Sequence, residues 1–228
     1  MSARGDFHHY KGASLARSEK IERYVAETLL KTTLPDTERE SSIIWELKHS
    51  AGCVQIGRIL AQARSLDVEI AETACVLHDI YVIVEGKYAD HAHQGAPLAK
   101  KILEENGEFS SDEIELIVSC VHDHSDKDVY SDNPYIELVK DADVFDCSLY
   151  KNAGNYYRIH KSPKVVADYE KRIKTVRSEL GLAEDPVLRA TLGAAARMKI
   201  QNEFSITRVM EIMESDYETL SVSQFRDE

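Results

Sequence analysis

The sequence predicts an all-α protein, and three observations lead to this fold class. The chain has 228 residues but only 10 Gly and 5 Pro, so it has few of the turn formers that many short strands require. Apolar residues recur at spacings of three and four, which is the period of an amphipathic helix. Residues that favour helix starts and ends flank these apolar stripes.

The first half of the chain contains five segments with this period. They cover residues 21–29, 45–60, 67–77, 91–106 and 110–121. Asp67 is placed to cap the third, and the run from Ser110 to Glu113 forms a capping box before the fifth. Residues 81–84, Tyr-Val-Ile-Val, are the one strand-like stretch, and they are too short to make a sheet alone.

Helix starts are also marked in the second half. Asn133-Pro134, Ser162-Pro163 and Asp185-Pro186 each place a capping residue before a Pro at the first helical position. These signals predict helices through 134–143, 163–180 and 186–198, the second ended by Gly181. A further helical stripe covers 206–220.

Charge and composition exclude several function classes. The formal net charge is -12 and no basic run is present, so electrostatic repulsion disfavours a long nucleic acid as a partner, whereas a small phosphorylated molecule is compatible with this charge. No stretch approaches the ~18 apolar residues that a membrane span needs. The N-terminus lacks the apolar core of a signal peptide, and the four scattered Cys are expected to be reduced. We therefore expect a cytoplasmic protein that does not enter a membrane.

Several metal-capable side chains fall on the apolar stripes rather than on the polar faces. His49 lies four residues before Cys53, and His78 lies four after Ala74. His124 continues the stripe of the 110–121 helix, and Asp143 lies four residues after Val139. A buried carboxylate is costly unless it is paired or binds a cation. One shared cation would offset the cost of all these inward polar groups.

Each of these residues also has an ordinary structural explanation. A lone His on an apolar face is more often a hydrogen-bonded core residue, Asp143 could pair with Lys140, and His-Asp dipeptides occur by chance. The combination favours a metal site. Imidazole and carboxylate ligands suit Fe, Mn, Zn, Ni or Co, with Mg also possible, and the lack of nearby Cys disfavours a thiolate-rich structural zinc site. His78 and Asp79 are adjacent, so both can reach one metal only near a helix end, unless Asp79 bridges to a second metal.

The order His49, His78-Asp79, Asp143 resembles the HD superfamily of metal-dependent phosphohydrolases. Residues 74–80, Ala-Cys-Val-Leu-His-Asp-Ile, resemble its central helix, and residues 138–143, Leu-Val-Lys-Asp-Ala-Asp, its last ligand segment. The resemblance implies an HD-domain helical bundle with additional C-terminal helices. It divides the chain into an N-terminal helical segment (1–40), an HD metal-binding core (41–148) and a C-terminal helical extension of the same domain (149–228).

Two further elements are similar to the members of this superfamily that hold two metals. His93-Gln94-Gly95-Ala96 resembles their His-x-Gly-Ala helix start, and 118–125 their next His-bearing helix end. The resemblance implies that Asp79 bridges two metals and that His93 and His124 bind the second, with His78 and Asp79 forming the catalytic pair. His91 and His122 compete with His93 and His124, because residues two apart on a helix face opposite ways.

The sequence departs from the family at one position. Many members carry a Lys shortly after the His-Asp pair, whereas this chain reads His-Asp-Ile-Tyr-Val. Lys87, Lys140 and His122 are the candidates for contact with a substrate phosphate. The resemblance implies hydrolysis of a phosphate ester or anhydride in a small, nucleotide-like substrate. The alternatives are a diiron oxygenase of the HD type and a non-catalytic HD binding or regulatory module.

Overall fold

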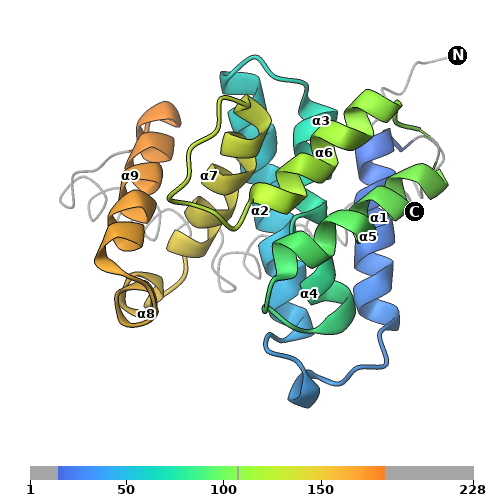
Figure 1. Ribbon diagram of the computed structural model, residues 1–228, viewed down its shortest axis with the longest axis horizontal. Coiled ribbons are helices and arrows are strands. Elements are labelled where there is room, and N and C mark those ends of the chain that lie inside the picture. The colour runs from blue at the N-terminus through green and yellow to red at the C-terminus, as the bar shows by residue number, and fades with distance from the viewer. Residues whose placement is uncertain (1–14, 107, 183–228) are drawn as a thin grey trace, which may run out of the picture. The chain divides into compact units, whose positions relative to one another are not determined.

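The structure, a computed structural model, describes residues 15–106 and 108–182 (Figure 1). Every regular element in these residues is helical, which confirms the all-α class. The helices are α1 (Arg17–Lys31), the 3-10 turn η1 (Asp36–Glu38), α2 (Ile43–Ala63), α3 (Val68–Leu77), α4 (Ile80–Glu85), α5 (His91–Asn106), α6 (Ser111–Asp123), α7 (Pro134–Ser148), α8 (Ala153–His160) and α9 (Pro163–Glu179).

The helix starts coincide with the capping signals. Ser110 accepts a hydrogen bond from the Glu113 amide while the Glu113 carboxylate accepts one from the Ser110 amide. Asn133 and Ser162 cap α7 and α9, each directly before a Pro. Gly181 follows α9 with φ +63°, a conformation that favours Gly. These local interactions explain why the helix bounds can be read from the sequence.

The strand-like expectation for residues 81–84 is wrong, because these residues belong to α4. The helix ends at Gly86, whose φ of +69° is left-handed. The Arg39 guanidinium donates to the buried carbonyls of Val82 and Ile83, in the last turn of this helix, at 2.7 and 3.1 Å. A four-residue apolar run does not distinguish a strand from a buried turn of helix, and tertiary contacts with Arg39 stabilise the helical form here.

The core brings together the helices that carry the candidate ligands. α2 packs against α3 and α7, α5 packs against α4 and α6, and α6 also contacts α3 and α7. The cluster of buried apolar residues includes Leu60, Leu77, Ile117 and Leu138, one from each of α2, α3, α6 and α7. Burial of these stripes is the main favourable term for such a bundle. It fixes the helix faces from which the polar ligands project.

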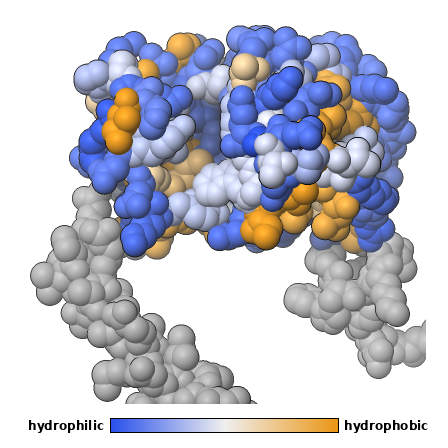
Figure 2. Space-filling model, turned by 90° about the horizontal axis from the view of Figure 1, so that it is seen from below, coloured by the Kyte–Doolittle hydropathy of each residue, from blue (hydrophilic) through white to orange (hydrophobic). Residues whose placement is uncertain are grey.

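The chain divides into two compact units, residues 1–180 and 181–228. α8 and α9 therefore belong to the same unit as the helices that carry the candidate ligands. The helices expected over 186–198 and 206–220 lie outside the described residues. Within the described ranges, no helix is long and apolar enough to cross a membrane. Figure 2 shows a largely hydrophilic face with a hollow near its middle and only small hydrophobic groups.

Candidate metal centre

Helix α2 carries His49 into the core. Ser42 caps the helix by accepting a hydrogen bond from the Trp45 amide at 3.1 Å, and the buried residues Cys53 and Leu60 continue the face on which His49 lies. His49 is 2% exposed. The Trp45 ring stacks on its imidazole, with centroids 5.6 Å apart and an interplanar angle of 14°. The ring is therefore held in one orientation.

His78 and Asp79 occupy the junction between α3 and α4. His78 retains right-handed helical geometry, whereas Asp79 has φ -101° and ψ 22°. This change of direction lets two adjacent side chains converge: His78 Nε2 lies 3.2 Å from Asp79 Oδ2. His49 Nε2 lies 3.2 Å from His78 Nε2 and 3.7 Å from Asp79 Oδ2.

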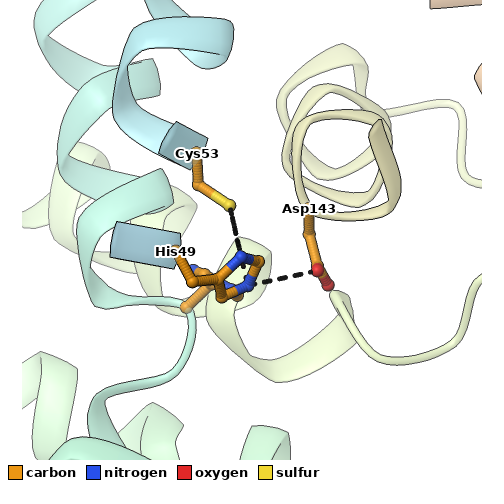
Figure 3. Close-up of side chains that lie close together, drawn as sticks. His49, Cys53 and Asp143 are labelled. Carbon is orange, nitrogen blue, oxygen red and sulfur yellow. Dashed lines mark hydrogen bonds and ion pairs between the residues drawn. The ribbon is translucent and has the colours of Figure 1, made fainter. Parts of the chain in front are cut away.

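Asp143, on α7, completes this first group. Its Oδ1 atom lies 3.4 Å from His49 Nε2 (Figure 3). Two ligand atoms that each lie about 2.1 Å from one ion are about 3 to 3.5 Å apart, so these separations suit a shared ion. The structure thus brings together the four residues His49, His78, Asp79 and Asp143.

A second group surrounds the other oxygen of Asp79. His91 Nε2 lies 3.3 Å and His124 Nε2 lies 3.4 Å from Asp79 Oδ1. The two histidine Nε2 atoms are 3.1 Å apart. Asp79 therefore directs one carboxylate oxygen toward each group, which is the arrangement expected of a residue that bridges two ions.

The structure corrects the choice of His93. His91, the first residue of α5, faces Asp79, while the half-exposed His93 pairs with Asp90 at 2.6 Å. His91 lies four residues before the buried Gly95, on the inward face, and His93 lies on the other side. Spacing from Gly95 is the sequence signal that could have identified His91. For the other pair, the structure agrees with the choice of His124: this residue points inward, whereas His122 is exposed beside Asp123.

The inward histidines share one hydrogen-bonding pattern. Each donates Nδ1–H to an oxygen at 2.7 or 2.8 Å: His49 to Asp146, His78 to Cys75, His91 to Tyr88 and His124 to Val121. In the neutral imidazole, Nε2 then carries a lone pair directed into the site. Lone pairs directed at one another across about 3 Å repel unless a cation or proton lies between them. Within the part of the chain that the structure describes, the buried Asp79 Oδ1 also receives no hydrogen bond, so the donor set fits metal ions.

Asp146 is a supporting residue that sequence reasoning missed. Its Oδ2 atom accepts the His49 Nδ1 hydrogen bond at 2.7 Å, and Asp146 is 4% exposed. A carboxylate behind a ligating His fixes the tautomer and raises the basicity of the ring. The position of Asp146, three residues after Asp143 on α7, is the sequence signal that could have found it.

The pKa values of His124, Asp79 and Asp143 fit metal ligands. Burial lowers the pKa of His124 to about 4, so this ring is neutral at pH 7. Burial acts to raise the pKa of Asp79, but His78 and His124 outweigh it and hold that pKa well below the usual value. Burial likewise opposes ionisation of Asp143, but Lys127 and His49 keep its pKa well below normal. Both carboxylates are therefore ionised at neutral pH.

The pKa values of His49 and His78 are raised instead. Burial acts to lower the pKa of both rings, but Cys53 and Asp143 outweigh it at His49 and Asp79 outweighs it at His78. A metal would therefore have to displace a proton from these two rings.

Cysteines lie nearer to the site than the sequence suggested. Cys53 Sγ is 3.7 Å from both ring nitrogens of His49 (Figure 3), and Cys147 Sγ is 3.7 Å from Asp143 Oδ1. Burial raises the pKa of Cys53 to about 12 and also raises the pKa of Cys147. Both are thus thiols in the absence of a metal, and Cys53 is a candidate ligand because its Sγ atom lies within 4.8 Å of ligand atoms of His49, His78 and Asp143.

The lysine that lies beside the ligands is Lys127, not Lys87 or Lys140, which were expected from the sequence. Lys127 is 4% exposed, and its ammonium group contacts Asp143 Oδ2 and the carbonyl of His124. Lys87 is exposed. Lys140 is buried but donates to the carbonyl of Val129 at 2.8 Å, outside the ligand groups. The position of Lys127 three residues after His124 was the available signal.

A buried acid lies close to the ligands. Glu46 is fully buried one helical turn before His49, and one carboxylate oxygen accepts hydrogen bonds from Ser41 and from the Tyr88 hydroxyl. Its other oxygen, Oε2, is buried and receives no hydrogen bond from any described residue. Burial and the negative charge of Asp79 raise the pKa of Glu46. The site therefore has a carboxyl group that retains a proton more readily than its ligands do.

Comparison with known proteins agrees with this geometry. Residues 47–147 match the sequence model of the HD domain. The matched segment is an HD domain that spans somewhat less than half of the chain, and the match supports a metal-dependent hydrolase family. No curated protein matches the sequence.

A crystal structure of a predicted HD superfamily hydrolase from an uncultured Thermotogales bacterium is similar to this chain. The two are 19% identical, with a TM-score of 0.47, and the match covers 72% of this chain and 88% of the other.

Proposed function

We propose that this protein is a metal-dependent phosphohydrolase that cleaves a phosphate ester or anhydride of a small, nucleotide-like substrate. The observation that carries the proposal is the division of the Asp79 carboxylate between two ligand groups. Oδ2 lies beside His49 and His78, and Oδ1 lies beside His91 and His124, all within 3.7 Å. Paired metal sites of this kind hold the attacking and leaving oxygens of a phosphoryl transfer in line.

The six inward side chains would act as ligands of two metal ions. His49, His78 and Asp143 would hold one divalent ion, His91 and His124 the other, and Asp79 would bridge them. Fe, Mn, Zn, Ni or Co suits these ligands. Bound metal supplies Lewis acidity, which acidifies water and polarises a phosphoryl oxygen.

Lys127 and Glu46 would complete the reaction centre. The Lys127 ammonium lies against Asp143, from which it can turn to a substrate phosphate oxygen as negative charge develops. Glu46, which keeps its proton readily, is suited to hold or return a proton near the leaving oxygen. Neither group was among the candidates identified from the sequence.

Surface charge and aromatic residues support a small nucleotide-like substrate. The net charge of -12 disfavours a long polyanion. Trp45 stacks on His49 and contacts Tyr150 at a centroid distance of 4.7 Å, and the Lys48 ammonium lies 5.2 Å from the Tyr150 ring. An aromatic and cationic group beside the ligands suits a base or sugar phosphate.

A diiron oxygenase is the second candidate, because the same six side chains can hold two irons. A non-catalytic binding module is disfavoured by the complete ligand set. The two enzymatic candidates differ in the metal required and in the reaction, so one preparation can distinguish them.

The test combines metal analysis with turnover. The full chain is purified without chelator, its metal content is measured, and hydrolysis of bis-p-nitrophenyl phosphate and p-nitrophenyl phosphate is assayed with added Mn²⁺. We expect one to two equivalents of metal and turnover that Asp79→Ala abolishes, since two ions depend on this carboxylate. Asp132→Ala, which removes an exposed carboxylate outside the ligand groups, is the matched control.

Two outcomes contradict the proposal. Two bound irons, visible absorption and no phosphatase activity would favour the oxygenase. A protein without bound metal, in which Asp79→Ala changes nothing, would remove the basis for both enzymatic functions.

A further inference from the structure

A cavity separate from the metal centre lies among α1, α2 and α3. Its volume is about 430 Å³, which is within the range of small-molecule sites. Its walls are mostly aliphatic and include Val25, Leu29, Leu47 and Val54. An apolar ligand body would be favoured there by removal of its surface from water.

Two polar atoms in this cavity have no hydrogen-bond partner among residues 15–106 and 108–182. Ser50 is 6% exposed, and its buried Oγ atom makes no hydrogen bond. The Oε1 atom of Glu22 is also buried without a donor. Both residues line the cavity. A buried polar atom without a partner destabilises the protein, so these two atoms indicate where a ligand's polar group would bind.

The charges around Glu22 favour a cationic group. Glu19 also lines the cavity, and Glu72 lies close enough to Glu22 to raise its pKa. Arg58 forms an ion pair with Glu72 at 2.5 Å, so the positive charge of Arg58 is already paired with the Glu72 carboxylate. Arg23 lines the cavity as well but is exposed. The polar end of the cavity is therefore rich in carboxylate.

We propose that this cavity is a binding site for a small primary ammonium compound with an aliphatic body. The ammonium donates to Glu22 Oε1 and Ser50 Oγ, and the alkyl chain packs against the aliphatic walls. An ammonium group has three donors and no acceptor, which matches two acceptors lacking donors. A carboxylate ligand would be repelled, and an alcohol would leave the charge of Glu22 unmatched.

The site is independent of the proposed hydrolase activity. Ser50 follows His49 on α2, but the adjacent side chains face different surroundings: His49 faces Asp79 and Asp143, and Ser50 faces the cavity. Binding of an ammonium compound should therefore not require metal. The variant Asp79→Ala should bind it as the wild type does, so failure of one proposal does not imply failure of the other.

The test uses the full chain and three probes that share a six-carbon body: n-hexylammonium, 1-hexanol and hexanoate. Binding is followed by amide NMR shifts and by the thermal midpoint at constant ionic strength. We expect saturable binding of n-hexylammonium, weaker binding of 1-hexanol and none of hexanoate. Glu22→Gln should weaken n-hexylammonium binding by about tenfold, as expected for loss of a charge-assisted hydrogen bond.

Two further variants complete the design. Glu27→Gln removes an exposed carboxylate from the same helix and should leave binding unchanged. Ala26→Leu places bulk into the cavity wall and should reduce binding of every probe. The proposal is overturned if n-hexylammonium does not bind, if 1-hexanol binds equally well, or if Glu22→Gln and Ala26→Leu both bind like the wild type.

Discussion

His49 donates its Nδ1 hydrogen bond to Asp146 across 2.7 Å, and both groups are buried. The contact joins α2 to α7 and leaves His49 Nε2 directed at Asp79 and Asp143. Asp146 thus determines which nitrogen of His49 can bind a metal, although Asp146 itself does not face the ligand groups.

We expect Asp146→Asn to weaken metal binding by about 10- to 100-fold, because an amide is a poorer acceptor and lowers the basicity of His49. Competition with a chelator of known affinity measures the change. The matched control is Asp123→Asn, which alters an equivalent contact between a carboxylate and the exposed His122. Equal metal affinity in both variants would show that Asp146 does not support the site.

Glycine is required at position 52 because the Asp146 carboxylate occupies the space that a side chain would need. A Cβ atom at Gly52 would lie 2.0 Å from Asp146 Oδ1, so Gly52→Ala should destabilise the fold by about 1–3 kcal/mol despite the better helix propensity of Ala. Urea unfolding measures the difference.

Gly154→Ala is the control for Gly52, since the nearest atom to its added Cβ is on the flexible Arg158 side chain at 3.7 Å. It should be neutral or slightly stabilising. Gly52→Ala combined with Asp146→Ala should recover part of the loss, because the clashing carboxylate is gone. Destabilisation that is the same with and without Asp146 would contradict this explanation.

The two histidines at the start of α5 provide a matched pair for the second ligand group. His91→Ala should lower the metal content from two equivalents toward one, because it removes a nitrogen 3.3 Å from Asp79 Oδ1. His93→Ala should leave the content unchanged, since His93 pairs with Asp90 at the surface. Metal analysis after gel filtration measures both. Loss of metal in His93→Ala alone would restore the assignment made from the sequence.

Lys127→Met should lower phosphoester turnover by about 10- to 100-fold if its ammonium contacts the substrate phosphate. Metal content should not fall, because the substitution removes a cation that competes for Asp143. Lys87→Met, at an exposed position, is the control. Full turnover in Lys127→Met would exclude Lys127 as the phosphate-binding cation.

Glu22 makes stability depend on pH. Burial, followed by Glu72 and Glu19, raises its pKa from 4.5 to about 7. Between these values the folded chain binds more protons than the unfolded chain, so this group lowers the free energy of unfolding as pH rises through that window. Glu22 is partly exposed, so solvent screening reduces its effect. Glu22→Gln should make the decrease in the free energy of unfolding with pH smaller by about 1–2 kcal/mol.

Urea unfolding at pH 5 and pH 7 measures the contribution of Glu22. Glu27→Gln is the control, because burial at this exposed position is negligible and its pKa is lowered by Lys31. The same pH dependence in wild type and Glu22→Gln would show that Glu22 titrates normally.

The sequence by itself determined the helices and most of the inward polar residues. Helical period and capping are local properties, so Ser110, Asn133 and Ser162 could be placed at helix starts from their neighbours alone. The apolar stripes also predicted that His49, His124 and Asp143 lie on the buried faces of their helices, because a residue's face follows from its spacing to buried neighbours.

Only the tertiary structure decided which groups meet across helices. Spacing from the buried Gly95 puts His91 rather than His93 on the inward face of α5, but the contact of His91 with Asp79 depends on how the chain enters this helix. Asp146 meets His49 across 97 residues, and Lys127 meets Asp143 from the loop between α6 and α7. The helical form of residues 81–84 is stabilised by Arg39, which donates hydrogen bonds to the carbonyls of Val82 and Ile83. Such contacts join segments distant in sequence, so a local period can place a side chain on a helix face but cannot show which group it meets there.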